Sequence, residues 1–109
     1  MKLRILKNSL RLRLNHSDIE QLERHQRISE SVYFPNSQVF RYSLTVSGAL
    51  SAFCLENEIG VAITKDACDC LVNLEEGLDF QIKGDGVDAL RILIEKDMPC
   101  RKDSHAASL

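Results

Sequence analysis

KLRILKNSLRLRL, residues 2–14, is the stretch of sequence that decides the fold. Apolar and basic residues alternate on both sides of its centre, most regularly in Leu10-Arg11-Leu12-Arg13-Leu14. Such period-two alternation is typical of β-strands that bury one face. Lys7-Asn8-Ser9, between the two alternating stretches, has the chemistry of a turn. The sequence therefore predicts a basic β-hairpin whose apolar residues contribute to a core.

After this hairpin, the pattern predicts further strands and two short helices. Ser17-Asp18-Ile19-Glu20 fits a capping box at the start of a helix that ends near Gln26. Thr64 is expected to cap a second helix, with Ala67, Leu71 and Cys68 facing inward. The further strands are expected at residues 32–34, 40–46, 50–55, 59–63, 78–82 and 90–94. We predict an α+β fold, with a mainly antiparallel sheet or small barrel built from two ββαββ halves.

The chain has 109 residues, enough for one ordinary domain. We expect that domain to span residues 1–97, with pseudo-repeats at 1–46 and 49–95, followed by a flexible tail at 98–109. The repeat is one of pattern rather than of side-chain identity. Its clearest part is the alternation of Leu10, Leu12 and Leu14, which returns in Ile59, Val61 and Ile63.

The bulk composition excludes several classes of protein. The net charge is −2, so the charge of the whole molecule favours neither nucleic acid nor an anionic membrane. No apolar run approaches the roughly 18 residues that a membrane-spanning helix needs. We expect no membrane association and a cytoplasmic location. There the cysteines (Cys54, Cys68, Cys70 and Cys100) would be reduced thiols.

The order of elements, together with Lys7-Asn8-Ser9 and the strand that follows it, resembles the swapped-hairpin fold of AbrB- and MazE-type transcription regulators and antitoxins. In the second half, Thr64-Lys65-Asp66 and the strands around it look like the same unit. Proteins of this type pair two chains to complete a barrel, so the resemblance implies a barrel completed within one chain. They usually have a proline directly after the second strand, where this sequence has Asn15 and Thr64.

A second resemblance concerns two short stretches, residues 8–14 and 90–97, which look like segments of short uncharacterised bacterial proteins. It implies a bacterial cytoplasmic protein and no particular activity.

The basic hairpin is the candidate functional site. Its five cations, all placed before the first acidic residue, are Lys2, Arg4, Lys7, Arg11 and Arg13. Such a cluster can neutralise phosphates and release counterions, and a β-ribbon can enter a major groove. DNA binding by the N-terminal hairpin is also what the AbrB/MazE resemblance implies. We predict that Lys7, Asn8, Arg11 and Arg13 contact nucleic acid. The alternative is a solvated outer face whose cations protect an exposed sheet edge.

The second half has the opposite charge. Its turn is Glu56-Asn57-Glu58, and residues 54–79 contain seven acids against the single Lys65. Nucleic-acid binding is therefore expected from the first half alone. The acidic half could instead repel nucleic acid or dock a basic partner.

We predict no catalytic residues, no metal and no cofactor. Cys68 and Cys70 stand two apart on a predicted helix and so point to different sides of it. Gly84-Asp85-Gly86 has the chemistry of a hairpin turn rather than of a phosphate loop. A protein partner or self-association stays open as the other interpretation, since sheet edges can pair with another chain and Tyr33-Phe34-Pro35 could make contacts.

Overall fold

The computed structural model describes residues 1–74, 76–86 and 88–97. Along the chain these residues form β1 (Lys2–Leu6), β2 (Ser9–Leu14), α1 (His16–His25), β3 (Arg27–Tyr33), β4 (Val39–Ser47), β5 (Ser51–Leu55), β6 (Glu58–Thr64), α2 (Lys65–Asn73), β7 (Leu78–Ile82) and β8 (Leu90–Lys96). The predicted α+β class is confirmed. The predicted tail, residues 98–109, lies outside the described residues, and so does Cys100.

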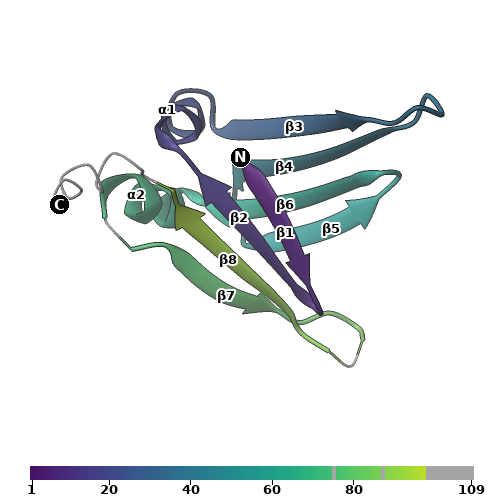
Figure 1. Ribbon diagram of the computed structural model, residues 1–109. Helices are drawn as coiled ribbons and strands as arrows, with labels where there is room; N and C mark the ends of the chain where they lie inside the picture. Colours follow the sequence, from purple (N-terminus) through teal and green to yellow (C-terminus); the bar gives the residue numbers. More distant parts are fainter. Residues whose placement is uncertain (75, 87, 98–109) are drawn as a thin grey trace, which may run out of the picture.

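The strands form two four-stranded sheets (Figure 1). Sheet A has the order β1-β2-β8-β7, and sheet B has the order β3-β4-β6-β5. In each sheet the two central strands are parallel and the outer strands pair antiparallel to them. The prediction of a small barrel is wrong for the described residues, because their strands lie in two separate open sheets.

The strands also do not separate into the two predicted halves. Sheet A combines hairpin β1–β2 from the first half with β7–β8 from the second, and sheet B combines β3–β4 with β5–β6. The mixing follows from the parallel central pairs, because a tight turn cannot join parallel neighbours. Sheet A is therefore completed by a hairpin from the opposite end of the chain, whereas sheet B joins two hairpins that are consecutive in the sequence. The ββαββ halves are not confirmed.

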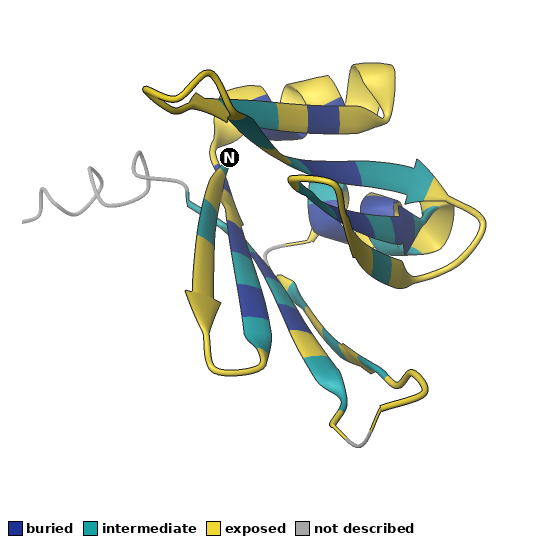
Figure 2. Ribbon diagram, turned by 90° about the vertical axis from the view of Figure 1, so that its right-hand side faces the viewer, coloured by how far each residue is buried: buried dark blue, intermediate teal, exposed yellow. Residues whose placement is uncertain are grey.

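A single hydrophobic core takes side chains from both sheets and both helices. Figure 2 shows buried residues alternating with exposed ones along the strands. The predicted alternation is confirmed at its centre, where Leu12 and Leu14 on β2 and Val61 and Ile63 on β6 are at most 2% exposed. The fully buried set also includes Leu22, Leu44, Leu71, Ile92 and Ile94. Each such side chain contributes roughly 1.5–3 kcal/mol of transfer free energy.

Both helices begin at capping residues at the end of a strand. The predicted cap at Thr64 is confirmed, since its hydroxyl accepts a hydrogen bond from the Ala67 amide at 3.1 Å. The predicted capping box at Ser17 is wrong. Asn15 caps α1 instead: its side chain accepts from the Asp18 amide at 2.8 Å, and the Asp18 carboxylate accepts from the Asn15 amide at 3.0 Å. The box thus lies two residues earlier, immediately after β2.

The α-amino group of Met1 joins β1 to sheet B and α1. It lies 2.9 Å from carboxylate oxygens of both Asp18 and Glu30. The Met1 carbonyl accepts a hydrogen bond from the Tyr42 hydroxyl at 3.0 Å. Burial disfavours the charged amine, but the hydrogen bonds to Glu30 and Asp18 outweigh it, and the pKa of the Met1 amine is raised above 8.0.

In the part of the chain that the structure describes, neither helix has the length and apolarity needed to cross a membrane.

Candidate nucleic-acid interface

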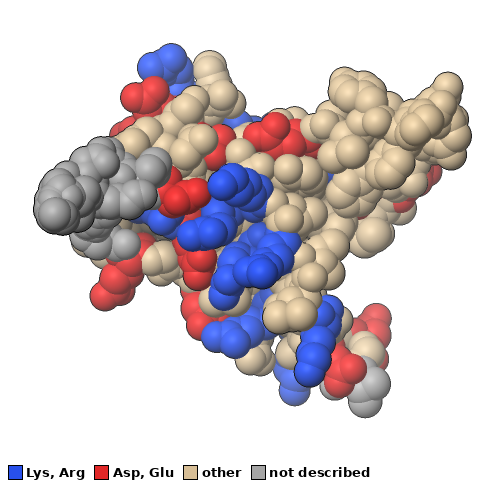
Figure 3. Space-filling view, viewed as in Figure 1, with Lys and Arg blue, Asp and Glu red and all other residues tan. Residues whose placement is uncertain are grey.

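The candidate interface is the face of sheet A that points away from the core. Alternation places Leu10, Leu12 and Leu14 inside and leaves Arg11 and Arg13 outside, where their side chains are 36% and 46% exposed. Figure 3 shows Lys and Arg side chains gathered over the region where β1 and β2 lie in Figure 1. The hairpin therefore presents its cations to solvent, as the sequence predicts.

The strand register places like charges directly across from each other. Lys2 lies opposite Arg13, and Arg4 lies opposite Arg11. Like charges in such cross-strand pairs destabilise a sheet by a few tenths of a kcal/mol or more. The fold therefore carries a local cost on this face, and an anion bound there would relieve it.

Two acidic residues from the end of sheet A partly neutralise these cations. Glu95 on β8 lies 3.7 Å from the Nε atoms of both Arg11 and Arg13. Asp97 lies 3.4 Å from the Nζ of Lys2. These pairs are partly exposed to solvent, where ion pairs contribute between 0 and about 1 kcal/mol. A phosphate could therefore compete for the same guanidinium groups.

Lys7 and Asn8 form the two-residue turn of the hairpin, but they have different roles. Lys7 adopts a left-handed conformation with φ 51° at the tip, and its amine has no ionic partner among the described residues. The Asn8 side-chain amide donates to the Ala89 carbonyl at 2.8 Å, and the Asn8 carbonyl accepts from the Arg91 amide at 3.2 Å. The structure thus uses Asn8 to hold the start of β8 against the hairpin, which leaves Lys7 as the free contact at the tip.

The predicted site residues leave out Arg91, which the fold brings to the same face. Arg91 lies opposite Ser9 in the parallel pairing of β2 with β8. Its Nε and Nη2 atoms donate to the two carboxylate oxygens of Asp79 at 3.1 and 2.8 Å, and these hydrogen bonds lower the pKa of Asp79. The signal in the sequence was the alternation of Leu90-Arg91-Ile92, which indicates that Arg91 faces outward. The alternation does not show which strand lies beside Arg91.

The cysteines and histidines do not form a reactive cluster in the described residues. Cys68 is buried on α2 and Cys70 is exposed, as their spacing predicts, and burial raises the pKa of the Cys68 thiol. His16 and His25 are the first and last residues of α1. Within residues 1–74, 76–86 and 88–97, no three His, Cys, Asp or Glu side chains are placed to hold a metal ion.

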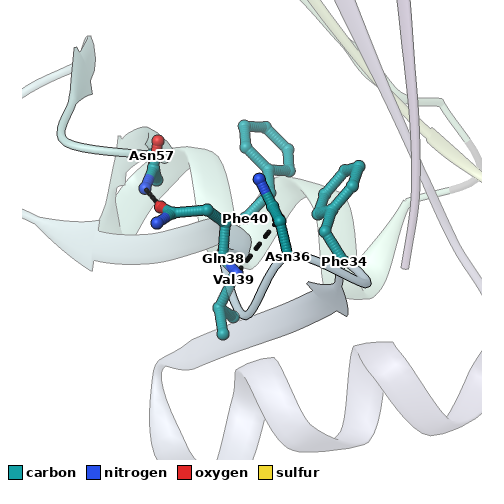
Figure 4. Close-up of a pocket in the computed structure, with 6 residues that line it drawn as sticks. All are labelled: Phe34, Asn36, Gln38, Val39, Phe40 and Asn57. Carbon is teal, nitrogen blue, oxygen red and sulfur yellow. Dashed lines mark hydrogen bonds between the residues drawn. The ribbon is translucent and has the colours of Figure 1, made fainter.

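A different kind of surface lies at the far end of the β3–β4 hairpin. Figure 4 shows a pocket there, with Asn36 between the rings of Phe34 and Phe40. The pocket has a volume of about 260 Å³ and is lined by apolar and amide side chains without any charge. The Asn57 side-chain amide donates to the Gln38 side-chain oxygen at 3.0 Å and so ties the β5–β6 turn to its edge. Phe34 is 49% exposed and the neighbouring Tyr33 is 77% exposed.

Comparison with known proteins gives a family match. A model for a family of unknown function (DUF7009) matches residues 1–108. No curated protein and no solved structure matches the chain.

Proposed function

Since the chain belongs to DUF7009, a family of unknown function, we propose its role from its own residues: a non-enzymatic, nucleic-acid-associated regulatory module. In this proposal the outer face of hairpin β1–β2 contacts phosphates through Lys7, Arg11 and Arg13, and Asn8 holds the turn in place. The protein would act in a bacterial cytoplasm. The resemblance of the hairpin to the basic turn of the AbrB/MazE type supports the same role.

The observation that carries this proposal is a difference between two sheets of the same architecture. In sheet A the pair opposite each other at the hairpin centre is Arg4 with Arg11, and in sheet B the corresponding pair is Phe53 with Gly60. Further along, Lys2 with Arg13 in sheet A corresponds to Ser51 with Ala62 in sheet B. Sheet B forms the same hairpin without any of these cations. The fold therefore does not require them, and a function in binding anions explains their presence.

The charge of the whole molecule sets the orientation of binding. With a net charge of −2, the chain can approach a polyanion favourably only through a locally positive face. On the other sheet, the turn at the corresponding hairpin is Glu56-Asn57, which would repel phosphates. We therefore expect the β1–β2 tip to lead, with the acidic turn pointing away.

A titration of labelled duplex DNA at two salt concentrations tests this proposal. If Lys7, Arg11 and Arg13 each contact one phosphate, the affinity should fall roughly 40-fold between about 50 and 200 mM salt, because each contact releases counterions. The double variant Arg11→Ala/Arg13→Ala should reduce that fall to roughly three- to fourfold, since it removes two of the three contacts. The matched control is Arg27→Ala/Arg41→Ala on β3 and β4, which removes the same charge from sheet B.

Two results would contradict the proposal. One is the absence of any DNA binding at low salt by a folded wild-type protein. The other is an equal loss of affinity in both double variants, because a nonspecific charge effect would explain it.

The second candidate function is a protein-interaction module without nucleic-acid contact. The observation that favours it is the uncharged pocket beside Phe34 and Phe40, next to the exposed Tyr33. Aromatic anchors in such pockets often supply much of the binding energy at protein interfaces. The two candidates can be separated with Phe34→Ser, which should leave DNA binding unchanged if the basic face is the functional one.

A further inference from the structure

A small pocket on the outer face of sheet A brings together three guanidinium groups. It lies across β1, β2 and β8 and has a volume of about 150 Å³. Its lining residues are Arg4, Leu6, Ser9, Arg11, Arg91 and Leu93. Arg4 and Arg11 face each other across the hairpin, and Arg91 reaches the pocket from the parallel strand beside Ser9. The site is thus assembled from residues that lie at opposite ends of the sequence.

We propose that this pocket binds a phosphoryl group, either the terminal phosphate of a nucleic acid or that of a small phosphorylated molecule. The inference deepens the proposed function and rests on it only where the phosphate belongs to a nucleic acid. It assigns the main binding contacts to Arg4 and Arg91, neither of which is among the predicted contact residues Lys7, Asn8, Arg11 and Arg13.

The charge of the pocket matches a phosphomonoester. Such a group carries between −1.5 and −2 charges at neutral pH and offers three strong acceptor oxygens. The pocket lining contains three arginines and no acid. Asp79 and Glu95 lie outside the lining and pair with Arg91 and Arg11, so they offset part of the positive charge without filling the site.

The arginines retain donors for a ligand. A guanidinium has five N–H donors. The two hydrogen bonds of Arg91 to Asp79 use one donor on Nε and one on Nη2, so about three N–H groups stay available. This pairing also fixes the plane of the Arg91 guanidinium, and a fixed plane favours bidentate contact with an oxyanion. Arg4 has no ionic partner among the described residues, so all of its donors are open.

The size of the pocket restricts the ligand to a single small group. Its volume of about 150 Å³ lies well below the ~300–1,000 Å³ of pockets that enclose drug-sized ligands. It is also several times the ~30 Å³ that one water occupies in the liquid. A phosphoryl group fits such a space, whereas a whole nucleotide would leave its base and sugar outside. Leu6 and Leu93 form the apolar part of its lining.

The corresponding place on sheet B shows that the fold does not need the three arginines together. There Arg41 holds the position of Arg91, since it lies opposite Glu58 in the parallel pairing of β4 with β6. The Arg41 amide donates to the Asn57 carbonyl at 2.9 Å, much as the Arg91 amide donates to Asn8. The ring of Phe53 lies over Gly60 where sheet A has its two facing arginines. Arg41 is therefore a natural control for Arg91.

The test is isothermal titration of the full chain with inorganic phosphate at constant ionic strength. Saturable binding is expected for the wild type, with roughly tenfold weaker binding in Arg4→Gln and in Arg91→Gln, because each loses a charge-assisted hydrogen bond. Arg41→Gln should bind like the wild type. A thermal melt checks the folding of each variant. Arg91→Gln loses its pairing with Asp79, so Arg4→Gln carries the test alone if Arg91→Gln does not fold.

Short oligonucleotides with a 5′-phosphate or a 5′-hydroxyl distinguish the sources of the phosphate. Tighter binding of the phosphorylated strand, lost in Arg4→Gln, assigns the pocket to a nucleic-acid end. Binding of inorganic phosphate with the expected variant pattern but without any duplex or oligonucleotide binding would keep the pocket and refute the proposed function. The pocket proposal fails if the wild type does not bind phosphate, or if Arg41→Gln weakens binding as much as Arg4→Gln does. It also fails if the wild type binds duplex DNA and added inorganic phosphate does not weaken that binding.

Discussion

Replacement of Glu95 by Gln is expected to raise the DNA affinity of the outer face of sheet A, whereas most substitutions there would lower it. Glu95 lies on β8 opposite Arg13 and 3.7 Å from the Nε atoms of both Arg11 and Arg13. It is the acid that a phosphate must displace to contact Arg11 and Arg13. The substitution Glu95→Gln keeps the size of the side chain and removes its charge. We expect the variant to be less stable and to bind DNA more tightly.

The magnitude follows from the geometry and the exposure of the pairs. Two unit charges about 4 Å apart attract by about 1 kcal/mol in water. Glu95 is 39% exposed, and measured exposed pairs contribute only 0.2–1 kcal/mol. Loss of both pairs should therefore lower the free energy of unfolding by roughly 0.5–1 kcal/mol, which shifts the Tm of such a small domain by a few degrees. In the variant a phosphate no longer has to break these two ion pairs, so its binding should be stronger by the same free energy. That corresponds to a roughly two- to fivefold gain in DNA affinity.

Fluorescence anisotropy with labelled duplex DNA at low salt measures the affinity, and urea unfolding measures the stability. Glu58→Gln is the matched control, because it removes one negative charge from sheet B, where Glu58 lies 3.9 Å from Arg27. The two variants have the same net charge and lose an acid from different sheets. If Glu95→Gln is folded and its affinity does not exceed that of Glu58→Gln, Arg11 and Arg13 do not contact phosphates, and the reasoning fails.

Two further predictions concern the fold. Gly77→Ala would place a Cβ against the backbone carbonyl of Ile94, and we expect urea unfolding to show a free energy of unfolding lower by about 1–3 kcal/mol. In the control Gly84→Ala the new Cβ meets nothing within 4 Å, so the free energy of unfolding should fall much less. Equal losses in the two variants would contradict the argument. The raised pKa of the Met1 amine means that the folded state binds this proton more tightly, so its stabilisation is present below about pH 8 and is lost as the pH rises through the raised value. Between pH 7 and 9.5 the free energy of unfolding should therefore fall more in the wild type than in Glu30→Gln, and an equal fall would refute the role of this pair.

The sequence predicted the positions of most strands because their buried residues follow a strict period of two. It missed the first part of β3, residues 27–31, for a physical reason. Glu30 occupies a position where a core-facing strand usually carries an apolar residue, and its carboxylate pairs there with the Met1 amine. A charged side chain in that position breaks the pattern that indicates a strand. The charge is tolerated because the Glu30 side chain is 40% exposed and pairs with the Met1 amine, a contact between residues far apart in the sequence.

The N-cap of α1 could not be decided from local sequence. Both Asn15 and Ser17 can cap a helix, and an acid follows each of them three residues later. The choice depends on Asp18, whose carboxylate contacts the Met1 amine at 2.9 Å as well as the Asn15 amide. This contact joins residues from β1 and α1, so it depends on the tertiary fold. The candidate site has the same limit. The predicted hairpin makes Arg4 and Arg11 neighbours, but only the β2–β8 pairing brings Arg91 beside them.

The two sheets separate what the fold needs from what the surface adds. Leu12 on β2 and Val61 on β6 are both nearly fully buried, so the core of each sheet uses equivalent apolar positions. On the outer faces the same register carries Arg4 with Arg11 in one sheet and Phe53 with Gly60 in the other. Packing constrains the inner positions in both sheets, whereas no packing reason requires the outer ones to differ. The cationic outer face of sheet A is therefore the part of the molecule where a function beyond folding should be sought first.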